Sequence, residues 1–193
     1  MRKYPRFVIV IVIFILFSSA YIYARELEIK IVDKRIEKSK VYTTVSLRGN
    51  ISYDTVEAIR NGITAKIYIT VQLLKNSGII SFGQGTISQK VVSFTISYDV
   101  WDNSFVVSNK SKKKVFRLKN PLKITEVIEK SINPMVLPLR SVRGNTKLIL
   151  RGKVEIQTIK LYPPFGIFLY FFDPWNYESK WSYTDSFTIE LKQ

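Results

Sequence analysis

The chain has 193 residues, 46% of them hydrophobic and 13% aromatic, which suits one domain with a sizeable core and excludes intrinsic disorder. Histidine and cysteine are both absent, which excludes disulfides, His-based and thiolate-based metal sites, and Ser-His triads. The 30 basic and 15 acidic residues give a net charge of +15, which would attract phosphates or anionic lipid head groups, although a lysine-rich composition alone also produces it.

Residues 1–24 have the layout of a secretory signal. A basic head precedes an unbroken apolar run from Phe7 to Phe17, and small residues that a signal peptidase reads follow it. The uncharged stretch 7–24 just reaches the length that crosses a hydrocarbon core of about 30 Å, so an uncleaved signal-anchor is an open alternative to a cleaved signal peptide. The residues assigned to this segment are Phe7, Val8, Ile9, Phe17, Ala20 and Ala24.

Both versions of the N-terminal segment export the rest of the chain, because the basic head stays in the cytoplasm by the positive-inside rule. We therefore expect residues 25–193 to form a single exported domain. Its predicted location is the periplasm or the outer face of the cytoplasmic membrane, where residues 7–24 would anchor it if they are not removed.

From Glu26 onward, apolar and polar residues alternate with the period of two that is typical of β-strands. A polar stretch, 33–40, separates the first two segments and indicates a hairpin. A lysine-rich cluster, 110–114, falls at another expected turn; we interpret it first as a solvated hairpin tip and second as a lipid or nucleic-acid contact. The expected strands are 27–31, 41–47, 63–73, 92–100, 105–107, 115–118, 148–156 and 181–191.

Two short helices interrupt the strands. Asp54 and Glu57 have capping-box spacing, which predicts a helix start there, and Gly62 is expected to end that helix as a left-handed cap. The second helix stops at Pro134 and has an apolar face formed by Ile124, Val127, Ile128 and Ile132. No nucleotide-binding glycine motif and no βαβ order occur. We expect a mainly β protein: an antiparallel β-sandwich with immunoglobulin-like layering, about seven strands and two short connecting helices, preceded by an N-terminal hydrophobic helix.

Carboxylates give three candidate groups. Asp99 and Asp102, with Asn103, could hold a hard cation, but the chemistry of a hairpin turn explains them better. Glu126 and Glu129 are interpreted as a solvated helix face. The third group could serve a glycosidase, which needs two carboxylates about 5 to 10 Å apart, although the sequence does not fix their separation. This group comprises Asp173, Glu178 and Asp185.

Three tryptophans could stack on sugars or bases, although aromatic residues at strand ends more often pack at the edge of a core: Trp101, Trp175 and Trp181. No motif identifies a catalytic residue, a cofactor site or a metal site. We therefore expect a protein that is not an enzyme and that uses no cofactor.

The stretch "YPPFGIFLYFFDPW", residues 162–175, carries no charge between Pro164 and Asp173. It is too short to span a bilayer as a helix, which needs about 20 residues. Both of its alternating faces are apolar, so we favour coverage by the domain itself, with a contact surface for membrane or a partner as the alternative. The candidate interaction surface comprises Phe165, Phe168, Tyr170, Phe172, Trp175 and Trp181.

The segment "ISYDVWDNSFVV" (96–107), the helix-bearing middle and the late pattern "LYPPFGIFLYFFDPWNYESKWSYTDSFTIEL" resemble an exported bacterial family catalogued as domain of unknown function 4390. The resemblance covers nearly all of residues 26–191. It implies a location in the bacterial envelope and an uncharacterised function, and it supplies no catalytic residues.

Two functions are compatible with these observations. The first is a non-enzymatic envelope module that binds a protein partner at the membrane or in the periplasm. The alternative is a glycan-binding, lipid-binding or carboxylate-based hydrolytic domain with a pocket near the C-terminal aromatic segment. Nucleic-acid binding is not expected, because it rests on net charge alone and conflicts with export.

Overall fold

The computed structural model describes residues 27–76, 85–109, 111–139, 146–159 and 176–189. The predicted signal or anchor segment and the aromatic run 162–175 lie outside this part of the chain. Within the described residues there are two helices, α2 (Tyr53–Arg60) and α3 (Lys123–Ile132). The strands of the same residues are β1 (Glu28–Glu37), β2 (Lys40–Arg48), β3 (Thr64–Lys75), β4 (Thr86–Asp99), β5 (Ser104–Asn109), β6 (Lys114–Leu118), β7 (Met135–Pro138), β8 (Thr146–Ile159), β9 (Tyr177–Glu178), β10 (Ser182–Tyr183) and β11 (Phe187–Ile189).

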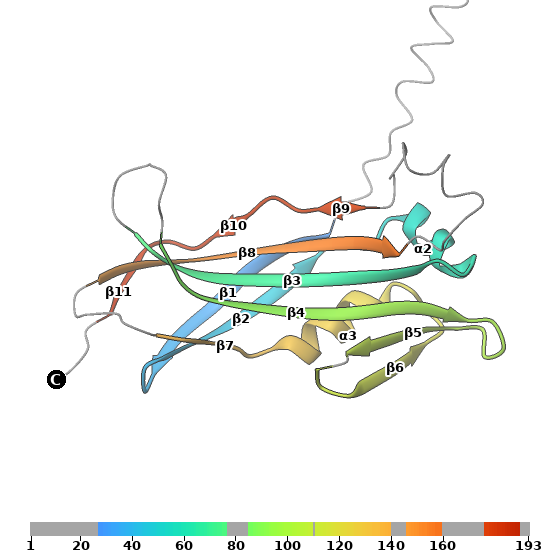
Figure 1. The fold of residues 1–193 in the computed structure, drawn as a ribbon, viewed down its shortest axis with the longest axis horizontal. Coiled ribbons are helices and arrows are strands. Elements are labelled where there is room, and N and C mark those ends of the chain that lie inside the picture. Colours follow the sequence, from blue (N-terminus) through green and yellow to red (C-terminus); the bar gives the residue numbers. More distant parts are fainter. Residues whose placement is uncertain (1–26, 77–84, 110, 140–145, 160–175, 190–193) are drawn as a thin grey trace, which may run out of the picture.

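The strands form two antiparallel sheets that lie face to face (Figure 1). The small sheet has the order β1-β2-β7, and the large sheet has the order β10-β8-β3-β4-β5-β6, with β9 and β11 also paired to β8. The expectation of a mainly β, antiparallel fold with two helices is confirmed. The described residues hold more strands than the sequence suggested, because the segment expected at 181–191 is divided into β10 and β11, and β7 and β9 are very short.

The core lies between the facing sides of the two sheets. Buried and partly exposed residues alternate along most of β3, where Thr70 and Leu74 are buried exceptions, and along β4 from Val92 to Ser97. One side of each strand therefore faces the core and most of the other side is at least partly open to solvent. Burial of these apolar side chains, at about 25 cal/mol per Å², is the main source of stability. The largest fully buried side chains include Leu27, Ile67, Ile69, Leu73, Phe94, Ile96, Phe105 and Leu137.

Gly152 in β8 lets the two sheets approach closely. A Cβ atom at this position would lie 3.1 Å from Cδ1 of Ile29 in β1, which is tighter than ordinary van der Waals contact. A larger residue would therefore push β1 away from β8. The glycine fits the sandwich because it has no side chain, rather than because its backbone conformation requires it.

Helix α3 and the residue after it lie beside β2 where the pairing of β2 with β7 stops. Asn133, which follows the helix, accepts a hydrogen bond from the amide of Val45 at 2.9 Å and donates one to its carbonyl at 2.7 Å. The Glu129 carboxylate accepts from the amide of Leu47 at 2.7 Å and from the hydroxyl of Ser46 at 3.2 Å. These side chains take the place of a neighbouring strand for β2. The interpretation of Glu129 as part of a solvated face was therefore wrong.

Helix α2 begins earlier than its capping-box pattern suggested. Ser52 is the N-cap, and its hydroxyl accepts from the amide of Thr55 at 3.2 Å. Glu57, the expected capping partner, instead pairs with Arg60 at 2.7 Å. Gly62, with a φ of 91°, follows the helix in the left-handed conformation, as expected. Neither described helix has the length and apolar character needed to cross a membrane.

The hairpin turns are tighter than the sequence indicated. The polar stretch 33–40 is almost entirely strand, and only Lys38 and Ser39, both with positive φ, form the turn between β1 and β2. A turn between β5 and β6 contains Lys112 and Lys113, as expected for a solvated lysine-rich tip. Polar pairing between the two strands explains why charged residues extend β1 beyond its apolar part.

Candidate functional site

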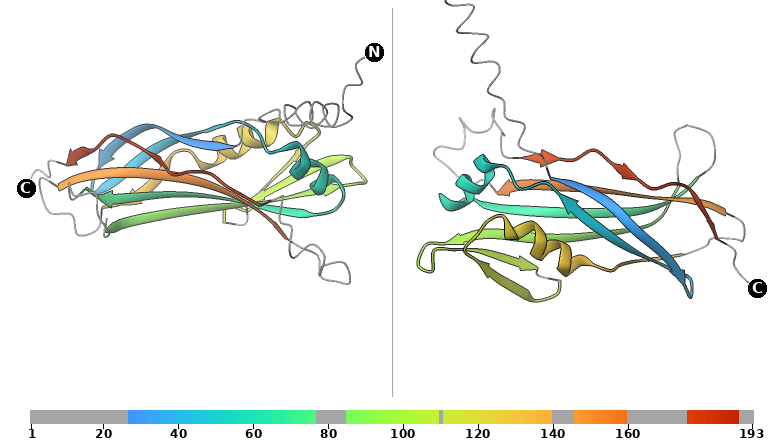
Figure 2. Two further views of the ribbon diagram at one scale, coloured as in Figure 1. Left: turned by 90° about the horizontal axis from the view of Figure 1, so that it is seen from above. Right: turned by 180° about the vertical axis from the view of Figure 1, so that it is seen from behind.

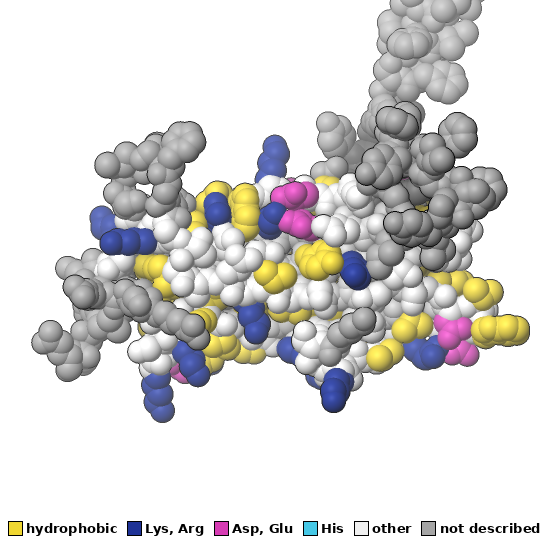
Figure 3. All heavy atoms as spheres, viewed as in Figure 1, with side chains coloured by type: hydrophobic (Ala, Val, Ile, Leu, Met, Phe, Trp, Pro, Cys, Tyr) yellow, Lys and Arg dark blue, Asp and Glu magenta, His cyan; other side chains and the backbone are white. Residues whose placement is uncertain are grey.

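The outer face of the large sheet, which points away from the small sheet, is the broadest surface of the described domain. β8, β3 and β4 lie at its centre, and no described helix or strand packs over them (Figures 1 and 2). The register between these strands sets the positions of their outward side chains: Tyr68 pairs with Ser93 and Glu155, and Thr70 pairs with Val91 and Lys153. In the space-filling view, acidic, basic and hydrophobic side chains gather near the centre of this face (Figure 3).

A compact group of charged and aromatic residues, which we call the Lys153 cluster, occupies the β8 side of the outer face. Lys153 Nζ donates to the Glu178 carboxylate at 2.7 Å and also pairs with Glu155. The pairing of β9 with β8 creates this arrangement, since Glu178 is the register partner of Glu155. The cluster comprises Arg151, Lys153, Glu155, Glu178 and Trp181.

Trp181 completes the cluster by lying against its two cations. The guanidinium of Arg151 is 4.2 Å from the centroid of the indole ring, and Nζ of Lys153 is 5.0 Å from it. Both distances fit cation–π contacts. The expectation that Trp181 packs at the edge of the core was wrong, because its partners are the polar side chains of the outer face.

The two glutamates change the protonation chemistry of Lys153. Hydrogen bonds from its ammonium to Glu155 and then to Glu178 raise the pKa of Lys153 above its usual value of 10.5. The amine is therefore charged at neutral pH and is unsuited to act as a base or nucleophile. Lys153 pairs with both carboxylates, and with Arg151 included the two cations balance the two carboxylates, so the cluster as a whole carries no net charge.

A chain of hydrogen bonds extends from the cluster across the sheet. Arg151 Nε donates to Oε1 of Gln72 at 2.8 Å, and Nε2 of Gln72 donates to Oε1 of Gln89 at 2.9 Å. On the other side, the Arg151 guanidinium lies 3.4 Å from the hydroxyl of Tyr183. Four strands, β4, β3, β8 and β10, are thus linked through their outward side chains, which holds this surface in one arrangement.

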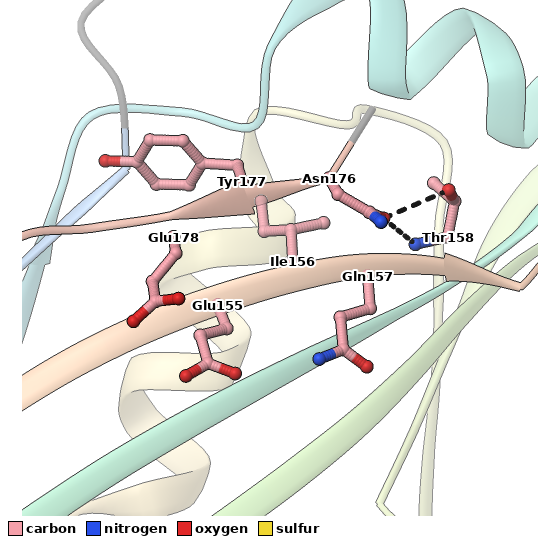
Figure 4. A pocket seen from close by; sticks show the side chains of 7 residues that line it. All are labelled: Glu155, Ile156, Gln157, Thr158, Asn176, Tyr177 and Glu178. Carbon is pink, nitrogen blue, oxygen red and sulfur yellow. Dashed lines mark hydrogen bonds between the residues drawn. The ribbon is translucent and has the colours of Figure 1, made fainter. Parts of the chain in front are cut away.

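A shallow depression of about 290 Å³ lies next to the cluster, between β8 and β9. Figure 4 shows Glu155 and Glu178 side by side on one side of it, with Tyr177 pointing away from them. Asn176 forms another side, where its Oδ1 accepts from the amide of Thr158 at 2.8 Å. Its polar and open character suits an extended surface better than an enclosed small-molecule pocket.

The predicted site residues are only partly brought together. Glu178 and Trp181 both belong to the Lys153 cluster, whereas Asp185 lies near β1, where its backbone carbonyl accepts from Lys34 Nζ at 3.3 Å. The residues of the proposed interaction surface and hydrolytic group that lie outside the described residues are Phe165, Phe168, Tyr170, Phe172, Asp173 and Trp175.

The group Asp99, Asp102 and Asn103 forms the turn between β4 and β5, as turn chemistry suggested. Both aspartates are paired with Arg117, at 2.7 and 2.5 Å. Trp101, at the tip of this turn, is 98% exposed, so the expectation of core-edge packing was wrong for this residue as well.

Sequence reasoning missed Arg151, Lys153 and Glu155. A signal for them was present, because they alternate with Leu150, Gly152, Val154 and Ile156, which places three charged side chains in a row on one face of the strand. Their partners, Glu178 and Trp181, are separated from them by more than twenty residues. The registers of β8 with β9 and with β10 bring the two groups together.

Comparison with known proteins gives a family but no activity. The model of the family described as "Domain of unknown function (DUF4390)" matches residues 24–185. The chain belongs to this family. The match includes every described helix and strand except β11. No curated protein and no solved structure matches the chain. The surface of this DUF4390 member is therefore what indicates its function.

Proposed function

We propose that this DUF4390 domain is a non-enzymatic interaction module of the bacterial cell envelope, which binds a protein partner through the outer face of its large sheet. The observation that carries the proposal is the Lys153 cluster, in which two carboxylates and an indole ring contact two cations, on a face over which no described helix or strand packs. Residues 7–24 would tether the module to the membrane or direct its export, in line with their apolar sequence.

Binding fits this cluster better than hydrolysis does. A glycosidase needs one carboxylic acid that donates a proton and one carboxylate that attacks or activates water. Glu155 and Glu178 instead pair with the same ammonium, that of Lys153. The geometry therefore does not give them the two different environments that separate acid and base roles need.

A protein partner fits the shape and composition of the outer face. Aromatic residues and arginine are enriched at the centres of protein interfaces, and Arg151, Trp181 and Tyr183 lie together here. The hydrogen bonds among Gln72, Gln89 and Arg151 fix these side chains before binding, which lowers the entropic cost of association.

A photocrosslinking amino acid placed at Tyr68 tests the proposal in living cells. Tyr68 lies on the outer face, opposite Glu155, whereas Tyr42 lies on the outer side of the small sheet and is similarly half-buried. We expect a specific crosslinked protein from position 68, none from position 42, and loss of the crosslink when Trp181→Ala is added. Equal crosslinking from both positions, or persistence in the Trp181→Ala protein, would contradict binding through this face.

Glycan binding is the second candidate, because Trp181, Tyr183 and Tyr68 present rings beside hydrogen-bonding side chains. Calorimetric titration of the full chain with soluble peptidoglycan and lipopolysaccharide fragments separates the two. If a fragment bound with measurable heat, the heat disappeared in the Trp181→Ala protein and position 68 gave no crosslinked protein, the ligand of this face would be a glycan rather than a protein. Glu178→Gln is the control for hydrolysis. If the domain cleaved these fragments by means of Glu178, this substitution would reduce the amount of cleaved product.

A further inference from the structure

The turn between β4 and β5 exposes two apolar side chains to solvent. Trp101 is 98% exposed and Val100 is 75% exposed, the two highest values among the large hydrophobic residues of the described chain. Hydrophobic side chains project at this end of the molecule beside acidic and basic ones (Figure 3). An indole that packs on nothing in its own domain is available for an external apolar environment.

The turn is braced by its own side chains, so the position of Trp101 is not an accident of a loose loop. Asp99 Oδ1 accepts from the amides of Trp101 and Asp102, at 3.1 and 3.4 Å. Arg117 on β6 then bridges the free carboxylate oxygens of Asp99 and Asp102. Asn103 has a positive φ of 51° and contacts the hydroxyl of Tyr98. The same bonds leave only one uncompensated negative charge at the base of the apolar tip.

The turn lies at the end of the domain where α2 leads into the start of β3. β1 starts farther along the sandwich: Ile29, its second residue, lies against Gly152, which is the register partner of Val71 in β3. The guanidinium of Arg60 in α2 is 5.6 Å from the ring of Phe105, the second residue of β5. Figure 2 shows α2 and the β4–β5 hairpin at the same end of the ribbon, opposite the β1–β2 turn.

Two further exposed apolar residues belong to this end. Tyr53, the first residue of α2, is 73% exposed, and Leu122, between β6 and α3, is 61% exposed. Leu122 is close in sequence to Lys119 and Lys123, both exposed. Aromatic residues with lysines beside them are typical of the interfacial zone of a bilayer, where an apolar body and a polar edge are both satisfied.

We propose that the β4–β5 turn is a membrane-contacting loop whose residues Val100 and Trp101 enter the interfacial zone of the lipid bilayer. This inference rests on the membrane tether of the proposed function: residues 7–24 end three positions before Leu27, at which the described chain starts. A tether that short keeps the whole domain at the bilayer surface and so gives the turn a high effective concentration of lipid.

Contact with a lipid surface suits the β4–β5 turn better than it suits the opposite end of the domain. There the β1–β2 turn consists of Lys38 and Ser39, with Glu37 and Lys40 beside them, and offers no apolar side chain for burial. The contact we infer is hydrophobic, and it therefore persists in uncharged vesicles. Adsorption driven only by the net charge of +15 would need anionic lipid and would weaken in salt.

Tryptophan fluorescence of the full chain, reconstituted in vesicles of phosphatidylcholine with and without phosphatidylglycerol, tests the proposal. The double variant Trp175→Phe and Trp181→Phe leaves Trp101 as the only tryptophan, and Trp101→Phe with Trp175→Phe leaves Trp181 as the matched control. We expect the emission of Trp101 to shift to the blue and to be quenched by lipids brominated on their acyl chains, in both vesicle types. Trp181, on the outer face, is expected to show neither change.

Each outcome decides the inference. Emission of Trp101 that stays at the position of an indole in water, in protein that remains with the vesicles after alkaline washing, overturns the contact and leaves the tether intact. If the protein washes off, the tether of the proposed function has failed, and the same quenching is then measured on protein added to preformed vesicles. Quenching there supports the loop contact, and its absence overturns it. Quenching only with phosphatidylglycerol also overturns it, in favour of charge adsorption.

Discussion

The two faces of the large sheet are made by the same strands and have opposite characters. In β3, Ile67 and Ile69 are fully buried against the small sheet, while Tyr68 between them looks outward. In β8, Val154 is fully buried and its neighbours Lys153 and Glu155 form part of the charged cluster. One alternating pattern therefore encodes both the fold and the candidate site, and the two can be changed separately by substituting neighbouring residues.

The largest effect is expected from the inner face. Phe94 in β4 is fully buried in the core, and Phe94→Ala should lower the free energy of unfolding by about 3–5 kcal/mol because it leaves a cavity. Ser93→Ala, one residue away on the outer face, should change it by less than about 0.5 kcal/mol. Urea denaturation measures both. Similar losses for the two variants would mean that the faces are not energetically distinct.

The second largest loss of stability is expected at the edge of the small sheet. Asn133→Ala removes both side-chain hydrogen bonds to the backbone of Val45 and should cost about 1–3 kcal/mol, since those groups lie half-buried. Glu126→Ala, on the exposed side of α3, is the control and should leave the stability close to that of the wild type, because its ion pair with Lys130 is open to solvent. Hydrogen exchange at the Val45 amide should accelerate in the first variant alone. An unchanged rate would show that α3 does not replace a strand beside β2.

The close contact between the sheets predicts a smaller loss that a second change can relieve. Gly152→Val should destabilise the protein by about 1–2 kcal/mol, because its Cβ would press on Ile29. Adding Ile29→Val frees space on the other side, so the double variant should be less destabilised than the sum of the two single variants. Thermal unfolding of all four proteins measures this coupling, and strict additivity would contradict a steric contact.

Most of the inner face was predictable from the sequence, and most of the outer face was not. Alternation located β3, β4 and β8, since burial on one face leaves a period of two in the sequence. The Lys153 cluster depends on the pairing of β8 with β9 across residues 160–175, and no local pattern fixes that register. Glu129 was misread for the same reason: its partners in β2 are more than eighty residues away.

For the β4–β5 turn, one prediction from the sequence was correct and another was wrong, and both outcomes have a physical cause. Asp99 and Asp102 were correctly assigned to a turn, because aspartate side chains accept hydrogen bonds from backbone amides nearby in the chain. The exposure of Trp101 could not be predicted in the same way. A tryptophan in an apolar context usually finds a partner within its own domain, and only the geometry of the turn shows that this one does not.

The smallest change in stability is expected from the outer face, where it tests whether Lys153 acts through its ion pairs or only through its charge. Lys153→Met should lower the free energy of unfolding by no more than about 1 kcal/mol at neutral pH, because it leaves Glu155 and Glu178 without their shared ammonium. The pKa of Lys153 is raised in the folded protein, so its stabilising contribution is complete below the ordinary lysine value of 10.5 and is lost as the pH rises above it. The difference between the wild type and the variant should therefore shrink as the pH rises past that value.

Lys66→Met is the matched control, since Lys66 lies on the same face opposite Gln157 and Thr95. If it gave the same pH-dependent difference, the two glutamates would not be the cause, and the cluster would be a set of independent surface charges.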